Sequence, residues 1–524
     1  MHWWQSAVVY QIYPRSFQDT NGDGVGDLAG ITARLPYLAE LGVDAIWLSP
    51  VYVSPMKDFG YDISDHAAID PRFGTMDDFD TLLRQAHALG LKIILDFVPN
   101  HTSDKHRWFA DSQSSRVSEK RDWYIWRDPS PQGGPPNNWL SEFGGSAWAY
   151  DAASGQYYYH AFLREQPDLN WRNPQVAAAM HDVMRFWLKR GVDGFRVDVL
   201  WHLIKDGQFR DEPANEEWHA GEPEYRRLRH IYSCDRPEVH DVVEGLRRVA
   251  DEFPERVLIG EIYLPLERVV AYYGRDLAGV HMPFNFILIE KPWKAADIAA
   301  LIERYEGLLP VGAWPNWVLG NHDRPRLAAR IGERQARIAA MLLLTLRGTP
   351  TLYYADELGM PQVAVAPGQL RDPWGVNVPG FGRDGCRTPM QWDRSPHTGF
   401  SSTAPWLPQS ADAAARNVEA QRAEPASMLN LYRRLMTVRR ANPALVTGGY
   451  RRITAENGVL TFLRQQDDER FLVALNLTDE PQSAILPGDE SGVVVISATA
   501  EREGQAVAGH IDLAARDGLV VKLT

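Results

Sequence analysis

Residues 92–101 read KIILDFVPNH, a run of apolar side chains that ends in polar ones. The run predicts a buried strand, and a stretch with helical periodicity precedes it around residues 76–89. The same order, a short apolar strand followed by an amphipathic helix, begins near residue 8 and resumes after about residue 176. Repeated units of this kind are typical of a parallel sheet covered by helices.

The strand candidates indicate a closed barrel. They are residues 8–12, 45–48, 92–98, 194–197, 257–262, 280–286, 317–321 and 351–354, and eight such strands favour a (β/α)₈ TIM barrel over an open sheet. A stretch rich in Trp, Tyr, Pro and Gly after the third strand predicts an inserted subdomain, and β-branched runs near the end predict an antiparallel β domain. The expected division is a barrel of residues 1–101 and 171–445, an inserted subdomain B of residues 102–170 and a C-terminal β domain of residues 446–524.

Composition excludes several classes of partner. The 524 residues are 44% hydrophobic and carry a formal net charge of −13, which disfavours nucleic acid and anionic membranes and suits a small neutral substrate. Cys234 and Cys386 are far apart and belong to no metal-binding motif, so free thiols in a reducing compartment are expected. With no signal sequence or membrane-spanning run recognised, we expect a cytoplasmic protein, either a monomer or a homodimer.

Four predicted strands end in polar residues, at the edge where a barrel of this kind builds its active site. These ends are residues 96–101 (DFVPNH), 194–198 (GFRVD), 258–261 (LIGE) and 319–323 (LGNHD). Alternation along a strand places Arg196 and Asp198 on the same side, and the guanidinium favours the ionised form of Asp198. Glu261, on the next strand, can supply the second carboxylate of a retaining glycosidase, because neighbouring strands are about 4.8 Å apart and the pair needs about 5–5.5 Å.

A structural explanation competes for each of these residues taken singly. A lone carboxylate after a strand often caps the following helix, and a lone histidine is often packed or hydrogen-bonded in a core. Carboxylates at several consecutive strand ends favour a catalytic site. Asp96, which lies before the strand turns outward, is interpreted as structural.

These strand ends resemble, in order and spacing, the signature regions of the α-amylase superfamily (glycoside hydrolase family 13). Residues 7–17 (AVVYQIYPRSF), 60–65 (GYDISD), 166–170 (QPDLN) and 383–392 (RDGCRTPMQW) look like its α-glucosidase and oligo-1,6-glucosidase branch. The resemblance covers essentially the whole chain. It implies that Asp198 is the nucleophile, Glu261 the general acid/base and Asp323 the carboxylate that stabilises the transition state.

The resemblance also implies a pocket for one terminal glucose, with Tyr61 as its stacking face. The implied lining residues are Asp58, Tyr61, His101, Phe162, Gln166, Arg196, His322 and Arg383. Arg387 lies four residues after Arg383 and is the alternative to it.

A second constellation, residues 19–27 (DTNGDGVGD), has oxygen side chains at alternate positions with glycines between them. Such a loop wraps a hard cation, as the start of an EF-hand does. Gly30 stands where an EF-hand has its glutamate, so the expected ligands are Asp19, Asn21, Asp23, the Val25 carbonyl and Asp27. An acidic turn without metal is the alternative, but the resembling branch commonly carries a structural Ca²⁺ here, with Mg²⁺ as a second choice, and no organic cofactor is expected.

Three functions are compatible with these motifs. The first is a retaining exo-α-glucosidase that releases glucose from short α-glucosides such as maltose, isomaltose or sucrose, with transglucosylation. The second is an isomerase or glucosyltransferase with the same residues, like sucrose isomerase or trehalose synthase, in which a sugar hydroxyl replaces water. The third, a non-catalytic relative that partners a transporter, is disfavoured because Asp198, Glu261 and Asp323 are all present. The choice between α-1,4 and α-1,6 linkages is left open, although Val199 after the nucleophile is typical of α-1,6-acting members.

Overall fold

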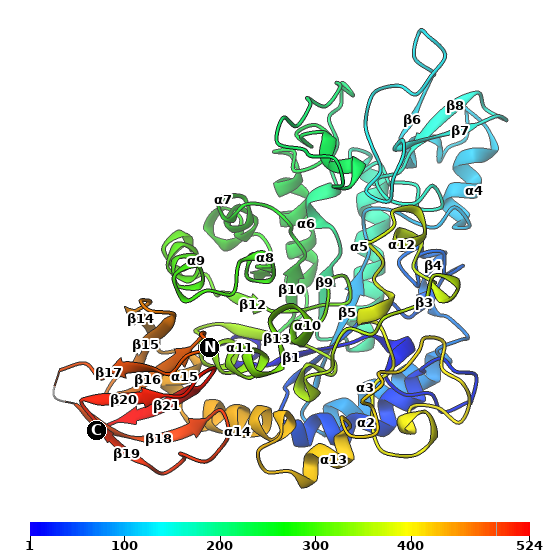
Figure 1. Ribbon diagram of the computed structural model, residues 1–524. Coiled ribbons are helices and arrows are strands. Elements are labelled where there is room, and N and C mark those ends of the chain that lie inside the picture. Colours follow the sequence, from blue (N-terminus) through cyan, green and yellow to red (C-terminus); the bar gives the residue numbers. More distant parts are fainter. Residues whose placement is uncertain (489) are drawn as a thin grey trace.

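Eight parallel strands form the central sheet of the computed structural model, which describes residues 1–488 and 490–524 (Figure 1). The hydrogen-bonded order is β11-β10-β9-β5-β2-β1-β13-β12. The strands are β1 (Val9–Ile12), β2 (Ala45–Leu48), β5 (Lys92–Phe97), β9 (Gly194–Val197), β10 (Val257–Gly260), β11 (Met282–Pro283), β12 (Asn316–Val318) and β13 (Thr349–Tyr353). One buried cluster combines side chains of β1, β2, β5, β10, β11 and β12, the two end strands among them, as expected of the interior of a closed barrel.

Helices follow the strands and cover the outside of the barrel (Figure 1). They begin and end with residues that satisfy free backbone groups. Thr75 and Asp78 form a capping box at the start of α3, and α5 begins with Asn173 as its cap and ends at Gly191, whose φ of 109° is left-handed. The principal helices are α2 (Leu28–Leu41), α3 (Met76–Ala88), α5 (Pro174–Arg190), α6 (Val239–Asp251), α9 (Ala295–Leu308), α11 (Glu333–Thr345) and α14 (Met428–Ala441).

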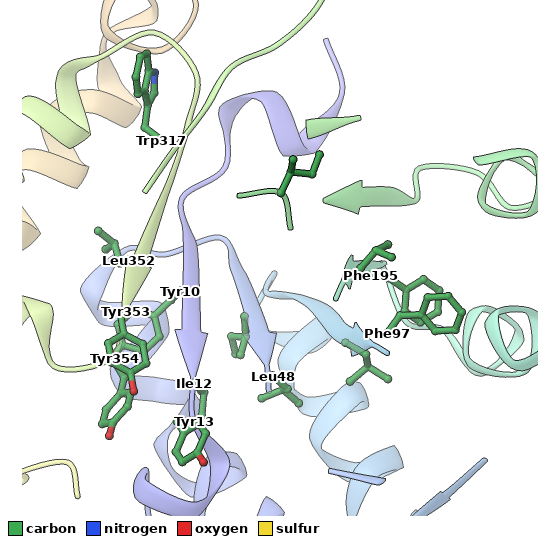
Figure 2. Close-up of a cluster of buried hydrophobic side chains, with 14 of the residues drawn as sticks. Tyr10, Ile12, Tyr13, Leu48, Phe97, Phe195, Trp317, Leu352, Tyr353 and Tyr354 are labelled. Atoms are coloured by element: carbon green, nitrogen blue, oxygen red, sulfur yellow. The ribbon is translucent and has the colours of Figure 1, made fainter. Parts of the chain in front are cut away.

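Side chains that point outward from the strands pack beneath these helices. Figure 2 shows Phe97 and Phe195 in this layer, with ring centroids 5.5 Å apart. Phe195 and Val197 therefore face the helices, while Arg196 between them lies inside the barrel, 5.0 Å from the ring of Trp47. The alternation predicted for this strand is confirmed.

Three predicted strands are at least two residues shorter than expected, and the fifth ends at Gly260 rather than at Ile262. The sixth covers Met282–Pro283 rather than residues 280–286, and the seventh Asn316–Val318 rather than residues 317–321. After Pro283 the chain makes one more backbone bond, from Phe284 to Gly260, and then turns into α8 (Ile287–Glu290). Apolar character continues past the strand ends because these residues are buried, so hydrophobicity overestimates the strand length.

The segment after β5 forms a small unit beside the barrel (Figure 1). It contains α4 (Arg107–Ser114) and a three-stranded antiparallel sheet of β6 (Trp126–Arg127), β8 (Gln156–Tyr159) and β7 (Trp148–Asp151). Aromatic rings fill its core: Phe109 packs against Tyr124, Trp126 and Tyr158 at centroid distances of 5.0, 5.7 and 5.1 Å. This unit extends the rim above one side of the strand ends.

The last part of the chain is an eight-stranded antiparallel sheet in the order β14-β15-β16-β21-β18-β19-β20-β17. Buried Arg464 ties it to the barrel, donating to the carbonyl of Leu445 at 3.0 Å and to that of Thr345, the last residue of α11. The strands are β14 (Gly449–Thr454), β15 (Val459–Gln466), β16 (Glu469–Asn476), β17 (Gln482–Ile485), β18 (Ser491–Ser497), β19 (Ala506–Ala508), β20 (His510–Leu513) and β21 (Gly518–Leu523).

Across the described part of the chain, none of the helices combines the length and the apolar character needed to span a bilayer.

Candidate active site

The three proposed catalytic carboxylates line one cavity of about 820 Å³. Asp198 directly follows β9, Glu261 directly follows β10, and Asp323 lies five residues after the end of β12. The ladder continues one residue beyond both strands, since Asp198 N donates to Phe97 O at 2.8 Å and Glu261 N to Val197 O at 2.9 Å. These backbone bonds fix where the two carboxylates leave the barrel.

One guanidinium joins two of these carboxylates. Arg196, which is fully buried, places Nη1 2.6 Å from Asp198 Oδ1 and Nη2 2.8 Å from Glu261 Oε1. Its Nη1 also lies 2.8 Å from Asp96 Oδ1 on β5. Because both side chains pair with the same planar group, Asp198 and Glu261 lie next to each other. Asp96, predicted to be structural, is completely buried and is not among the cavity-lining residues.

Burial raises the pKa of both carboxylates of the pair. Burial raises the pKa of Glu261 to about 7, against the opposing effect of Arg196. Burial also raises the pKa of Asp198, and Arg196 again opposes the rise. A pair with one shared proton can supply both an acid and a carboxylate at neutral pH.

Asp323 is held ionised. Burial favours its neutral form, but His322, Arg383 and Arg387 together keep its pKa well below the usual range. Arg383 Nη1 and Arg387 Nη2 both approach Asp323 Oδ1, at 3.0 and 2.9 Å. A permanent negative charge therefore faces the cavity.

Arg383, rather than Arg387, reaches the cavity. Arg383 lines it and also pairs with Asp58 at 2.7 Å, whereas Arg387 is completely buried behind it. Asp372, which the motifs did not indicate, accepts a 2.7 Å bond from Arg383 Nη2. Its pKa lies at about 2, because Arg383 and Arg387 more than offset its burial. Asp372 caps the short helix α12 (Pro373–Asn377), which follows no barrel strand and carries no family motif, so no signal in the sequence pointed to a functional role.

The residues expected around a terminal glucose converge on the same cavity. Asp58, Tyr61, His101, Phe162, Gln166, His322 and Arg383 line it, and of the predicted set only Arg196 lies behind the lining. Gln166 Nε2 bonds Asp58 Oδ2 at 3.2 Å and His101 Nε2 at 3.1 Å, which joins subdomain B to the barrel. Tyr61 is stacked on His322 at 5.3 Å, so one of its ring faces is already covered.

Other lining residues were not predicted. Most come from connections whose folding no local pattern reveals. They are Glu142, Phe143, Trp201, Pro223, Tyr225, Arg226, His230, Cys234, Tyr263, Phe286, Arg324 and Trp374. Aromatic residues next to the motifs, such as Trp201 and Tyr263, were the only available signal.

The acidic loop after β1 is a tight turn. Asp19 accepts backbone N–H bonds from Gly22 and Gly24 at 2.8 Å each, and Asp27 caps α2 through a 2.6 Å bond from Gly30 N. Within residues 1–488 and 490–524, no three His, Cys, Asp or Glu side chains are gathered closely enough to hold a metal. The oxygen-only donors of the loop fit a hard cation, but here they accept the N–H bonds of the turn.

Known proteins place the chain in a family. The profile described as "Alpha amylase, catalytic domain" matches residues 11–448. A probable alpha-glucosidase of Rhizobium meliloti (strain 1021) is 45% identical over 503 residues, covering 93% of this chain and 91% of that protein. An oligo-1,6-glucosidase of Heyndrickxia coagulans is 38% identical over 531 residues, covering 93% and 94%.

A solved structure has the same overall architecture. The crystal structure of an alpha-glucosyl transfer enzyme superposes with a TM-score of 0.94 at 42% identity, covering 100% of this chain and 99% of that one. Given the family match, the identities and the carboxylates at the strand ends, the chain belongs to the α-amylase family of glycoside hydrolases, family 13.

Proposed function

We propose that the chain is a retaining exo-α-glucosidase that releases glucose from the non-reducing end of short α-glucosides. The observation that carries the proposal is the binding of Asp198 and Glu261 by the single guanidinium of Arg196 at the wall of one cavity. The names of the two relatives, an alpha-glucosidase and an oligo-1,6-glucosidase, support the substrate class.

The proposed reaction is a double displacement. Asp198 attacks the anomeric carbon while Glu261 gives its proton to the glycosidic oxygen, so that the C–O bond breaks, the leaving sugar departs neutral and a glucosyl-enzyme remains. Glu261, now a carboxylate, takes a proton from water, whose oxygen attacks the anomeric carbon and frees Asp198. Glucose keeps its α configuration, and Asp323 stabilises the positive charge that develops on the sugar ring in both steps.

The exo mode is supported by the inner end of the cavity. Asp58, His101, Gln166 and Arg383 are buried there and bonded to one another. Such a buried polar group suits the hydroxyls of one terminal sugar.

A second candidate is transfer of glucose to another sugar, either as transglucosylation or as isomerisation. Its support is the similarity to an alpha-glucosyl transfer enzyme and a cavity of about 820 Å³, which has room for an acceptor beyond the glucose site. Transfer differs from hydrolysis only in which hydroxyl attacks the glucosyl-enzyme.

Product analysis on maltose, isomaltose, sucrose and starch tests both candidates. We expect free glucose from the disaccharides, little from starch, and oligosaccharide products at high substrate concentration. Sucrose isomers as the main product would favour the second candidate. No turnover of any of these α-glucosides would overturn the proposal.

We further propose that residues 19–27 bind Ca²⁺, with Asp19, Asn21, Asp23, the Val25 carbonyl and Asp27 as ligands. The ion would stabilise the loop and has no part in the reaction. Metal analysis and melting temperatures with and without a chelator test this, and Asp23→Ala should lower the melting temperature while glucose release persists. Purified protein without metal and with an unchanged melting temperature would contradict the proposal.

A cytoplasmic location is proposed on chemical grounds. Cys234 and Cys386 are buried free thiols, as expected of a protein in a reducing compartment. Cell fractionation would test the location. A monomer or homodimer remains the prediction, and light scattering on the purified protein would distinguish the two.

A further inference from the structure

One part of the cavity wall comes from the long connection between β9 and α6 rather than from a strand end. Pro223, Tyr225, Arg226, His230 and Cys234 of this connection line the cavity. None of them takes part in the double displacement described above. Contacts within this connection hold these residues at the cavity wall.

Most of these residues belong to a loop that closes on itself, residues 213–230, here named the wall loop. Asn215 N donates to Arg227 O at 2.8 Å, and Arg229 N donates to Pro213 O at 2.9 Å. Within the loop, the rings of Tyr225 and His230 are stacked with centroids 3.6 Å apart. These contacts bring the two ends of the loop together and fix the orientation of both rings.

A single buried carboxylate ties the two ends. Glu212 immediately precedes the wall loop and is 3% exposed. Its Oε2 accepts the N–H of Ile231 at 2.9 Å, and its Oε1 accepts those of Tyr232 and Ser233 at 2.8 and 2.6 Å. Hydrogen bonds to a charged acceptor are stronger than neutral ones, so this side chain is a specific latch for the residues that follow the loop.

The latch is itself fixed from subdomain B. Asn138 Oδ1 accepts Glu212 N, and Asn138 Nδ2 donates to Glu212 O, both at 2.8 Å. On either side of this region, Phe209 and Asp235 have φ angles of 53° and 49°, in the left-handed range that non-glycine residues seldom adopt. Such strain persists only where the surrounding structure determines the conformation, which indicates that the path of the chain is firmly specified.

We propose that Glu212 is a positioning residue that sets the specificity for the leaving sugar. Its carboxylate holds the wall loop against the cavity, so that Tyr225, Arg226 and His230 contact the sugar beyond the cleaved bond. Their aromatic and polar groups suit the apolar faces and hydroxyls of a neutral sugar. The inference rests on the proposed α-glucosidase function and adds to it the residue that places the binding site of the leaving sugar.

The test compares Glu212→Gln with Glu224→Gln, a matched change within the wall loop at a glutamate whose side chain is 51% exposed. Each is assayed on maltose, isomaltose and α-glucosyl fluoride, whose leaving group is too small to reach the loop. In Glu212→Gln an NH₂ group replaces one carboxylate oxygen and faces a backbone N–H, so a hydrogen bond is lost. The kcat/KM for the disaccharides should therefore fall roughly tenfold or more, mainly through a higher KM. Activity on the fluoride should stay within about twofold, and Glu224→Gln should match the wild type on all three substrates.

Two further variants make the result decisive. Glu212→Asp keeps the charge and should recover part of the lost disaccharide activity. Tyr225→Ala leaves the latch intact and should reproduce the selective loss. Equal losses on the fluoride and the disaccharides, or no loss on either, would overturn the role of Glu212. A wild-type protein inactive on α-glucosyl fluoride would instead overturn the proposed function.

Discussion

Two buried glutamates follow strands of the same barrel, and only one of them lies in the cavity. Glu261 directly follows β10, and Glu357 lies four residues after β13. Burial raises the pKa of each to about 7. By burial and pKa alone, the two are indistinguishable.

Their surroundings separate them. Glu261 lines the cavity, pairs with Arg196 and accepts the N–H of Val199 at 2.8 Å. Glu357 accepts the hydroxyls of Tyr10 and Tyr37 at 2.8 and 2.6 Å and is not part of the cavity lining. A raised pKa therefore indicates a candidate catalytic acid only where a cavity and a charged partner accompany it.

The largest effect is expected from removing the proposed acid or the proposed nucleophile. Glu261→Gln and Asp198→Asn should each lower kcat by about 10³-fold or more, because each residue makes or breaks a covalent bond or moves the proton. The melting temperature should stay close to that of the wild type. Turnover near the wild-type value in both variants would show that the cavity does not mark the catalytic pair.

Stopping the reaction and detecting a covalent intermediate distinguishes the nucleophile from the general acid/base. With a good leaving group, Glu261→Gln should accumulate the glucosyl-enzyme, detectable by mass spectrometry, since only its second step needs a base. Asp198→Asn should form none. A covalent adduct on any residue other than Asp198 would reassign the nucleophile.

The next effect is on pH dependence. A carboxyl with a raised pKa keeps its proton to higher pH, so Glu261 can act as an acid below about 7 and loses that ability above it. Activity, measured as kcat/KM on maltose, should therefore fall about tenfold per pH unit on the alkaline side of this value. Asp323, with its depressed pKa, contributes no transition in this range. A constant kcat/KM up to pH 9 would exclude Glu261 as the acid.

Glu357→Gln should leave kcat unchanged within about twofold and instead change stability. The folded state binds the Glu357 proton more tightly than the unfolded chain does, since its pKa is about 7 instead of 4.5. Stability of the wild type is therefore lost as pH rises from 4.5 to about 7. The neutral amide cannot ionise, so the variant should avoid up to about 3 kcal/mol of this loss in the free energy of unfolding. It should melt at a higher temperature than the wild type at pH 8 and at a similar temperature at pH 4.5.

Two outcomes would contradict the structural role of Glu357. A large loss of kcat in Glu357→Gln would mean that this glutamate also serves the reaction. Equal melting temperatures of the two proteins at pH 8 would mean that Glu357 ionises without cost in the folded state.

The smallest expected effect concerns linkage. Val199 lines the cavity next to Asp198 and has a left-handed φ of 36°, which is unusual for a β-branched residue. Val199→Thr or Val199→Ala should raise the maltose-to-isomaltose ratio of kcat/KM several-fold, because one methyl-scale contact is worth about 1–3 kcal/mol. Ala355, which has a φ of 68° beside Asp356 and is not among the cavity-lining residues, offers the control Ala355→Gly, which should leave the ratio unchanged. An unchanged or reversed ratio in the Val199 variants would assign linkage choice to the surrounding loops.

Local patterns in the sequence predicted much of the barrel. The helical periodicity around residues 76–89, and the alternation that places Arg196 inside and Phe195 outside, are properties of neighbouring residues. Strand lengths were predicted less well, because burial continues beyond the ends of β11 and β12 at Pro283 and Val318. The family motifs predicted seven residues that line the cavity, namely Asp58, Tyr61, His101, Phe162, Gln166, His322 and Arg383.

Periodicity, strand ends and family motifs are local features, so the sequence was enough to name the candidate carboxylates. Contacts between distant residues were needed to show that one guanidinium pairs with both Asp198 and Glu261 and that Arg383 rather than Arg387 reaches the cavity. They were also needed to show that Asp372 binds Arg383 and that Glu212 binds the backbone after the wall loop. The physical reason is that these relations join residues far apart in the chain. Asp58 and Arg383, 325 positions apart, meet at 2.7 Å only because the barrel closes and its long connections fold over one edge.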